Sequence, residues 1–251
     1  MSTTVAGVRT FTKPAAALPG RRFDHFFFSV TAGLMLATVA VGFAPTYYLA
    51  GVFHAPLPST IVHIHGALFS CWILLLIIQN SLVLAGRVDI HRKLGLAGFL
   101  LACLMVVVGA TAATDRLARA TAPPNFDPYF FYIIPMTDMV IFATLILFAY
   151  RARRDSPSHK RFIYVATVAL LTAAIARFPW TWVHRKAPRA AIASYAFLLL
   201  LCAYDLWSIR KIHRATLWAS GILIFIQQIR LPIGRTAAWH AFAVWIRSVV
   251  R

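Results

Sequence analysis

The sequence predicts an all-α bundle that crosses a membrane with seven transmembrane helices. The chain is 60% hydrophobic, its mean hydropathy is +0.73, and only 13% of its residues are charged. A soluble domain of 251 residues has too little interior to hide that much apolar surface, so we expect the surface to face lipid. Glu is absent, and seven Asp form the whole acidic complement.

Seven apolar segments of membrane-spanning length define the expected helices. They cover approximately residues 26–48, 60–84, 93–113, 129–150, 162–178, 190–208 and 215–229. Ser59 or Thr60 can cap the second helix, because a hydroxyl there can accept a bond from a free backbone N–H. Together these segments make one transmembrane bundle, residues 23–231.

The two ends of the chain differ from the bundle in composition and in residue spacing. Residues 1–22 are rich in small, polar and basic residues, which predicts a disordered cytoplasmic tail. Residues 232–251 form a C-terminal tail in which Trp239, Phe242 and Trp245 recur at helical spacing. This pattern predicts an amphipathic helix at the membrane interface.

The distribution of Lys and Arg predicts an N-in, C-out orientation. With the N-terminus inside, the inner segments hold fifteen basic residues and the outer segments hold nine. We expect the inner basic turns to contact anionic lipid headgroups. This placement accounts for the formal charge of +18 without nucleic acid, and no basic groove with interleaved aromatic residues is visible in a soluble segment.

Three of the inner turns share a pattern. Each places a His immediately before an apolar helix, namely His91, His159 or His213. The pattern is either a weak internal repeat of three hairpins or a product of the positive-inside rule alone, and the sequence leaves both open.

One face of the second helix carries polar and aromatic residues. His65, Trp72 and Gln79 are spaced by seven, so they form a single stripe, which we expect to face the bundle. The stripe serves either helix packing or a ligand. His63 and His65 look like a metal motif, but residues i and i+2 of a helix point about 200° apart, so we predict no metal site there.

Asp138 is the acidic residue placed well inside a span. A carboxylate within the membrane is a functional candidate by default. We expect it to pair with Arg177 at the outer end of the fifth helix. The predicted site is an outward-facing polar pocket between the second, fourth, fifth and seventh helices, with these candidate residues: His65, Trp72, Gln79, Asp138, Arg177 and Arg230.

Histidine pairs could instead hold haem b. A haem in a helical bundle needs two His at similar depth on facing helices, and His91 with His159, or His65 with His240, could meet this need. The alternative is that these residues contact headgroups or cap helices. No Cys-x-x-Cys-His attachment motif is present.

The string HxHGxLFxxWxLLxxxQxxLVxxGRVxxHRxLG, residues 63–95, resembles a group of uncharacterised bacterial multi-pass membrane proteins. Residues 159–177 and 204–218 resemble the same group. The resemblance implies a multi-pass protein of the bacterial inner membrane and implies no reaction. A His- and Gln-bearing helix followed by HRxLG is similar, more loosely, to membrane cytochromes of the b561 kind, which implies haem b.

The sequence carries none of the common local enzyme motifs. We find no P-loop, nucleophile elbow, dinucleotide fingerprint or HExxH, so a non-enzymatic protein is favoured. Three functions stay open: a small-solute- or proton-handling or accessory protein of the inner membrane, a b-type haem redox protein, and a scaffold or assembly subunit with a membrane-protein partner.

Overall fold

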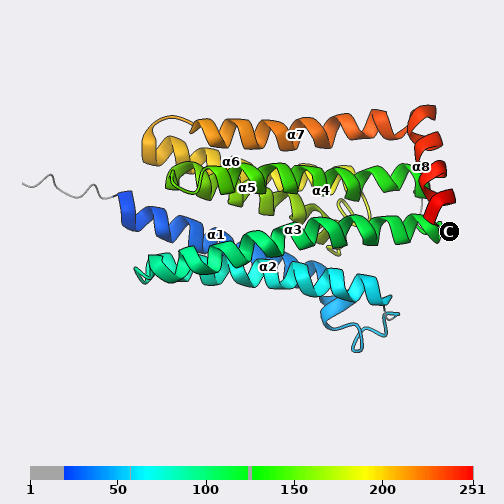
Figure 1. The fold of residues 1–251 in the computed structure, drawn as a ribbon, viewed down its shortest axis with the longest axis horizontal. Coiled ribbons are helices and arrows are strands. Elements are labelled where there is room, and N and C mark those ends of the chain that lie inside the picture. Colours follow the sequence, from blue (N-terminus) through cyan, green and yellow to red (C-terminus); the bar gives the residue numbers. More distant parts are fainter. Residues whose placement is uncertain (1–19, 57, 124–125, 251) are drawn as a thin grey trace, which may run out of the picture.

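The structure, a computed structural model, describes residues 20–56, 58–123 and 126–250. Within these residues the chain is all-α: seven long helices run roughly along one axis, and a shorter eighth lies across one end (Figure 1). The helices are α1 (Gly20–Phe43), α2 (Thr60–Leu84), α3 (Val88–Ala118), α4 (Pro128–Arg151), α5 (Ser156–Ile175), α6 (Ala187–Ile209), α7 (Arg214–Gly234) and α8 (Ala237–Val250). A π-helical turn, η1 (Ala44–Tyr48), follows α1. The predicted tail, residues 1–22, lies almost wholly outside the described residues.

The protein is a polytopic membrane protein. By length and composition, α1 with η1, α2, α3, α4, α6 and α7 can each cross a membrane, which makes six spans among the described residues. Their outer faces carry large apolar side chains, and Leu100, Val107, Leu199 and Phe225 are each more than 60% exposed. Such a surface is unfavourable in water and suits contact with lipid.

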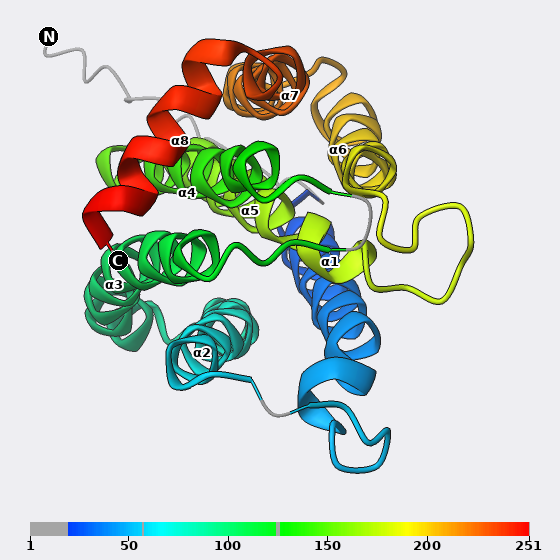
Figure 2. The same cartoon turned by 90° about the vertical axis from the view of Figure 1, so that its right-hand side faces the viewer.

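The helix α5 lies at the centre of the bundle. It packs against α1, α4, α6 and α7, and its residues from Tyr164 to Ala169 are all buried (Figure 2). It is the long helix that is not among the six apolar spans, because it opens with the polar run SPSHKR. A membrane helix enclosed by other helices can carry polar and charged residues, because these find partners inside the bundle.

Several helix limits differ from those expected. The helix α2 begins and ends at the expected residues, whereas α3 adds a turn or more at each end, and α7 continues through Pro232 to Gly234. The start of α4 has a clear cause: Pro128 occupies the first turn and the Asp127 carboxylate accepts from Phe130 N–H at 2.7 Å. Ser59 is the N-cap of α2 but makes no side-chain cap.

The two ends of the bundle have different connections. One, the hairpin end, holds the start of α1 and the short α2–α3, α4–α5 and α6–α7 turns. The other, the loop end, holds the longer α1–α2, α3–α4 and α5–α6 connections and the transverse α8 (Figure 1). The C-terminal segment forms the helix α8, which packs Ala243 against the end of α3 and the start of α4.

Small residues set the contact between α1 and the central helix. A Cβ atom added at Gly42 would clash with the backbone oxygen of Ala174, in α5. The two backbones therefore touch where only glycine fits, as is common where membrane helices pack closely. Gly33, on the same helix, has nothing within 4 Å of its added Cβ.

We predict that Gly42→Ala lowers stability while Gly33→Ala does not. The extra methyl at position 42 must push α1 from α5, at an expected loss of about 1–3 kcal/mol in the free energy of unfolding. Ala at position 33 is expected to leave stability unchanged or raise it, since Ala is the better helix former. Unfolding in detergent micelles measures both, and equal stability of the two variants would contradict the close approach.

Candidate functional site

A buried ion pair at the hairpin end joins α5 to α6. The Arg161 guanidinium contacts the Asp205 carboxylate, and both side chains are at most 4% exposed. Arg161 also donates through Nε to the same carboxylate oxygen at 3.0 Å, and through one terminal nitrogen to the Pro157 carbonyl at 2.8 Å. The other Asp205 oxygen accepts from the Thr216 hydroxyl at 2.6 Å and from His213 N–H at 3.0 Å. Every polar atom of this pair therefore has a partner.

A second pair lies beside the first. The Lys160 ammonium contacts the Asp24 carboxylate of α1, and the Tyr204 hydroxyl donates to that carboxylate at 2.7 Å. Burial, and then the positive charge of Arg161, lower the pKa of His213 at the α6–α7 turn. A neutral His213 suits its role, because its Nδ1 accepts from Ala215 N–H at 3.1 Å and so caps α7.

Nearer the loop end, Asp138 pairs with Arg230 on α7, not with Arg177 as predicted. Arg230 is 2% exposed; one terminal nitrogen contacts the Asp138 carboxylate and lies 3.2 Å from the Thr137 hydroxyl and 3.3 Å from the Ile134 carbonyl. Asp138 lies ten residues, about 15 Å, into α4 from Pro128. The pair thus lies deep within the bundle.

The position of Arg177 explains the correction. It follows the end of α5, donates to the Ala173 carbonyl of its own helix, and lies 4.5 Å from the centre of the Phe43 ring. Burial, and then the charge of Arg116, lower the pKa of Arg177 to about 10. Arg230 was expected beyond the end of the seventh helix, but α7 continues past it and turns it inward.

Two buried polar atoms at the Asp138–Arg230 pair lack a hydrogen-bond partner among the described residues. They are the Arg230 Nε atom and the Gln227 Oε1 atom. Gln227 lies one turn before Arg230, is 2% exposed, and donates to the Thr172 hydroxyl of α5 at 3.4 Å. The sequence interpretation missed Gln227, although its spacing of three from Arg230 was the signal that both lie on one face.

The polar stripe of α2 lies against different neighbours along its length. The Trp72 indole donates to the Thr167 hydroxyl of α5 at 3.2 Å. His65 packs on Phe69 near the loop end, and its Nδ1 is buried without a partner among the described residues. Gln79, suitably oriented, donates to Nδ1 of His91 at 2.7 Å. It therefore lies near the hairpin end, whereas Asp138 lies nearer the loop end.

Of the two histidine pairs considered for haem, His91 and His159 lie close together. The rings of His91 and His159 lie 6.5 Å apart between centres, with planes at 89°. Nδ1 of His159 donates to the Ala149 carbonyl at 2.9 Å, and Nδ1 of His91 is held by Gln79. His240, on α8, instead lies 3.7 Å from Asp127. His65, on α2, packs against Phe69.

No group of three or more His, Cys, Asp or Glu side chains within the described ranges could hold a metal ion. Comparisons with models of protein families, with curated proteins and with solved structures find no match. What can be said of this protein's activity therefore comes from the geometry of its own residues.

We predict that Asp205→Asn lowers the free energy of unfolding by about 3–5 kcal/mol, because it leaves the Arg161 charge buried and unpaired. Adding Arg161→Met to this variant is expected to recover part of the loss, because it removes the buried charge that Asp205→Asn leaves unpaired. Chemical unfolding in micelles of the wild type, the two single variants and the double variant measures the coupling between the two residues. Strict additivity of the two losses would contradict a coupled pair. Asp89→Asn is the control, because Asp89 is 66% exposed beside Arg87.

Proposed function

We propose that this protein handles protons or small polar solutes within the membrane, and that Asp138, Arg230 and Gln227 form its site. The observation that carries the proposal is the pair of buried atoms without a partner among the described residues, Arg230 Nε and Gln227 Oε1, beside an intramembrane carboxylate. A buried polar atom without a partner costs about 1–3 kcal/mol, so its presence calls for a bound group.

The chemistry of the site suits a small donor-and-acceptor molecule. Arg230 Nε offers a donor and Gln227 Oε1 an acceptor, one turn apart on the same face of α7. A water molecule or a small hydroxyl- or amide-bearing solute can accept from the first and donate to the second. The neighbouring Asp138 carboxylate can then take up or release a proton.

The contrast with the hairpin end supports this assignment. The Arg161–Asp205 pair is as deeply buried, yet each of its polar atoms is bonded within the protein. A fully bonded network stabilises one structure, whereas an incompletely bonded one can accept a ligand. We therefore assign the structural role to Asp205 and the functional role to Asp138.

The topology that suits this role has seven spans, with α5 as the seventh and the N-terminus inside. Its support is that α5 lies alongside the six apolar spans and that the hairpin end holds the basic turns of residues 87–93, 151–161 and 210–214. On this assignment the hairpin end faces the cytoplasm and its basic residues meet lipid headgroups. The bacterial inner membrane is proposed on the sequence resemblance.

We predict that Asp138→Asn abolishes transport, and that it also lowers stability because it leaves the buried Arg230 charge without its partner. In vesicles reconstituted with the wild type, a potassium-valinomycin potential should drive a protein-dependent proton flux, read by an internal pH dye, or a pulse of urea or glycerol should enter faster than in empty vesicles. Asp138→Asn should reduce the rate to that of empty vesicles. Asp115→Asn, which alters a surface pair with Arg119, is the matched control and should keep the wild-type rate.

Wild-type vesicles no faster than empty ones in every assay would overturn the proposal, as would full activity of Asp138→Asn. The helical circular dichroism and the size-exclusion profile of both variants in micelles, at the temperature of the assay, establish that a lost rate is not a lost fold.

A second function, b-type haem binding, is favoured by the His91–His159 geometry. Two imidazoles that share one metal, with metal–nitrogen bonds of about 2 Å, place their ring centres roughly 6 Å apart, and the observed separation is 6.5 Å. His159 donates through Nδ1, so the lone pair of its Nε2 is free for iron. Nδ1 of His91 accepts from Gln79, so its Nε2 carries the ring proton and binds iron after losing it.

For haem we predict a Soret band that shifts on reduction in protein expressed with ample haem. His159→Ala should abolish the band by removing one axial ligand, and His240→Ala, at the other end of the bundle, should not. A featureless visible spectrum of the haem-supplied wild type rules out this second function.

A further inference from the structure

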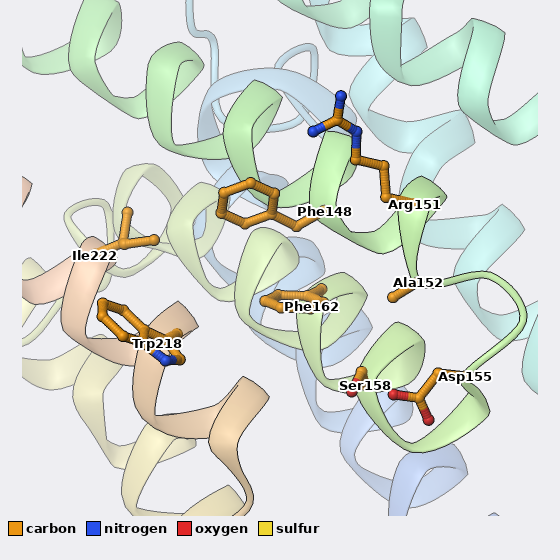
Figure 3. Close-up of a pocket in the computed structure, with 8 residues that line it drawn as sticks. All are labelled: Phe148, Arg151, Ala152, Asp155, Ser158, Phe162, Trp218 and Ile222. Atoms are coloured by element: carbon orange, nitrogen blue, oxygen red, sulfur yellow. The ribbon is translucent and has the colours of Figure 1, made fainter.

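A groove at the hairpin end is independent of the proposed site. It lies between the end of α4, the start of α5 and the first turns of α7, and encloses about 620 Å³ (Figure 3). Its lining residues are Phe148, Arg151, Ala152, Asp155, Ser158, Phe162, Trp218 and Ile222. The view shows the aromatic and aliphatic side chains from α4, α5 and α7 converging, with Arg151 and Asp155 to the right.

The groove changes from polar to apolar along the bundle axis. Arg151 and Asp155 flank the α4–α5 turn at the hairpin end, and Ser158 lies in the first turn of α5. Phe162 lies seven residues beyond Asp155, about 10 Å deeper, and Ile222 lies eight residues, about 12 Å, into α7. This order of a charged rim and an apolar floor is that of one phospholipid in one leaflet.

The charges at the rim are free to bind. Asp155 is the one Asp of seven that has no basic side chain of the described residues within 4.0 Å. It occupies the N-cap of α5 without making a side-chain cap. Arg151, equally exposed, makes no ion pair or side-chain hydrogen bond within the described part of the chain. A cation and an anion thus stand at one rim without pairing with each other.

We propose that this groove binds a zwitterionic aminophospholipid. The lipid phosphate accepts from Arg151 and Ser158, and the lipid ammonium donates to Asp155. One acyl chain lies over Phe148, Phe162 and Ile222, and Trp218, which is 71% exposed, closes the side of the groove toward the bilayer.

The paired charges select this headgroup over others. A purely anionic lipid satisfies Arg151 but brings a second negative charge toward Asp155. A choline headgroup has no N–H to donate to the carboxylate, so it loses that hydrogen bond. The aminophospholipid alone satisfies both rim residues at once.

The test is competitive retention of lipid by the full-length protein. Detergent-solubilised protein is given equal amounts of phosphatidylethanolamine, phosphatidylcholine and phosphatidylglycerol, purified, and its bound lipid is measured by native mass spectrometry. The wild type should retain phosphatidylethanolamine in excess. Asp155→Asn should lower that preference on the order of tenfold, the equivalent of one charge-assisted hydrogen bond.

Matched variants separate the groove from general basicity. Arg151→Gln should reduce total bound lipid, whereas Arg153→Gln should not, because Arg153 lies outside the groove and stacks on Tyr150. Equal retention of the three lipids, preference for phosphatidylglycerol, or an unchanged preference in Asp155→Asn would each overturn the proposal. The substituted side chains are exposed, so the unfolding midpoints should match the wild type.

Discussion

The rest of the bundle depends on the way in which α5 carries charge into the membrane. Lys160 and Arg161 lie in its first turns, and an unpaired charge there would be expensive to bury. Asp24 of α1 and Asp205 of α6 meet them, and Asp205 also binds Thr216 of α7. Four helices are thereby joined at one end by two neighbouring ion pairs. This contact lets a helix with a polar start serve as the buried centre of the fold.

The seven Asp residues divide according to how completely each is bonded. Asp205 is saturated and holds helices together, whereas Asp138 has a buried Arg230 whose Nε has no partner among the described residues. Asp155 has no ion-pair partner in the same part of the chain and stands at the rim of an open groove. Because an unmet polar group is costly in a membrane, the degree of bonding separates a structural carboxylate from one available to a ligand.

Hydropathy and the helical periodicity of the sequence predicted much of the fold and less of the site. The limits of α2 and the facing of Trp72 toward α5 follow from local patterns, because a seven-residue spacing keeps one face aligned. The partner of Asp138 could not be read this way. Arg230 is 92 residues away and lies inside the bundle only because α7 continues through Pro232, which a sequence pattern treats as a stop. Similarly, SPSHKR resembles a polar turn in the sequence, yet it forms the start of α5, where Arg161 is buried against Asp205 of α6.

We propose that the Asp138 carboxylate exchanges a proton, whereas the Asp205 carboxylate stays in its ion pair with Arg161. Infrared difference spectra of the reconstituted protein, recorded between two pH values, report on individual protonated carboxyl groups. We expect a pH-dependent carboxyl band in the wild type that is lost in Asp138→Asn and kept in the surface control Asp115→Asn. A carboxyl band that survives unchanged in Asp138→Asn would contradict it.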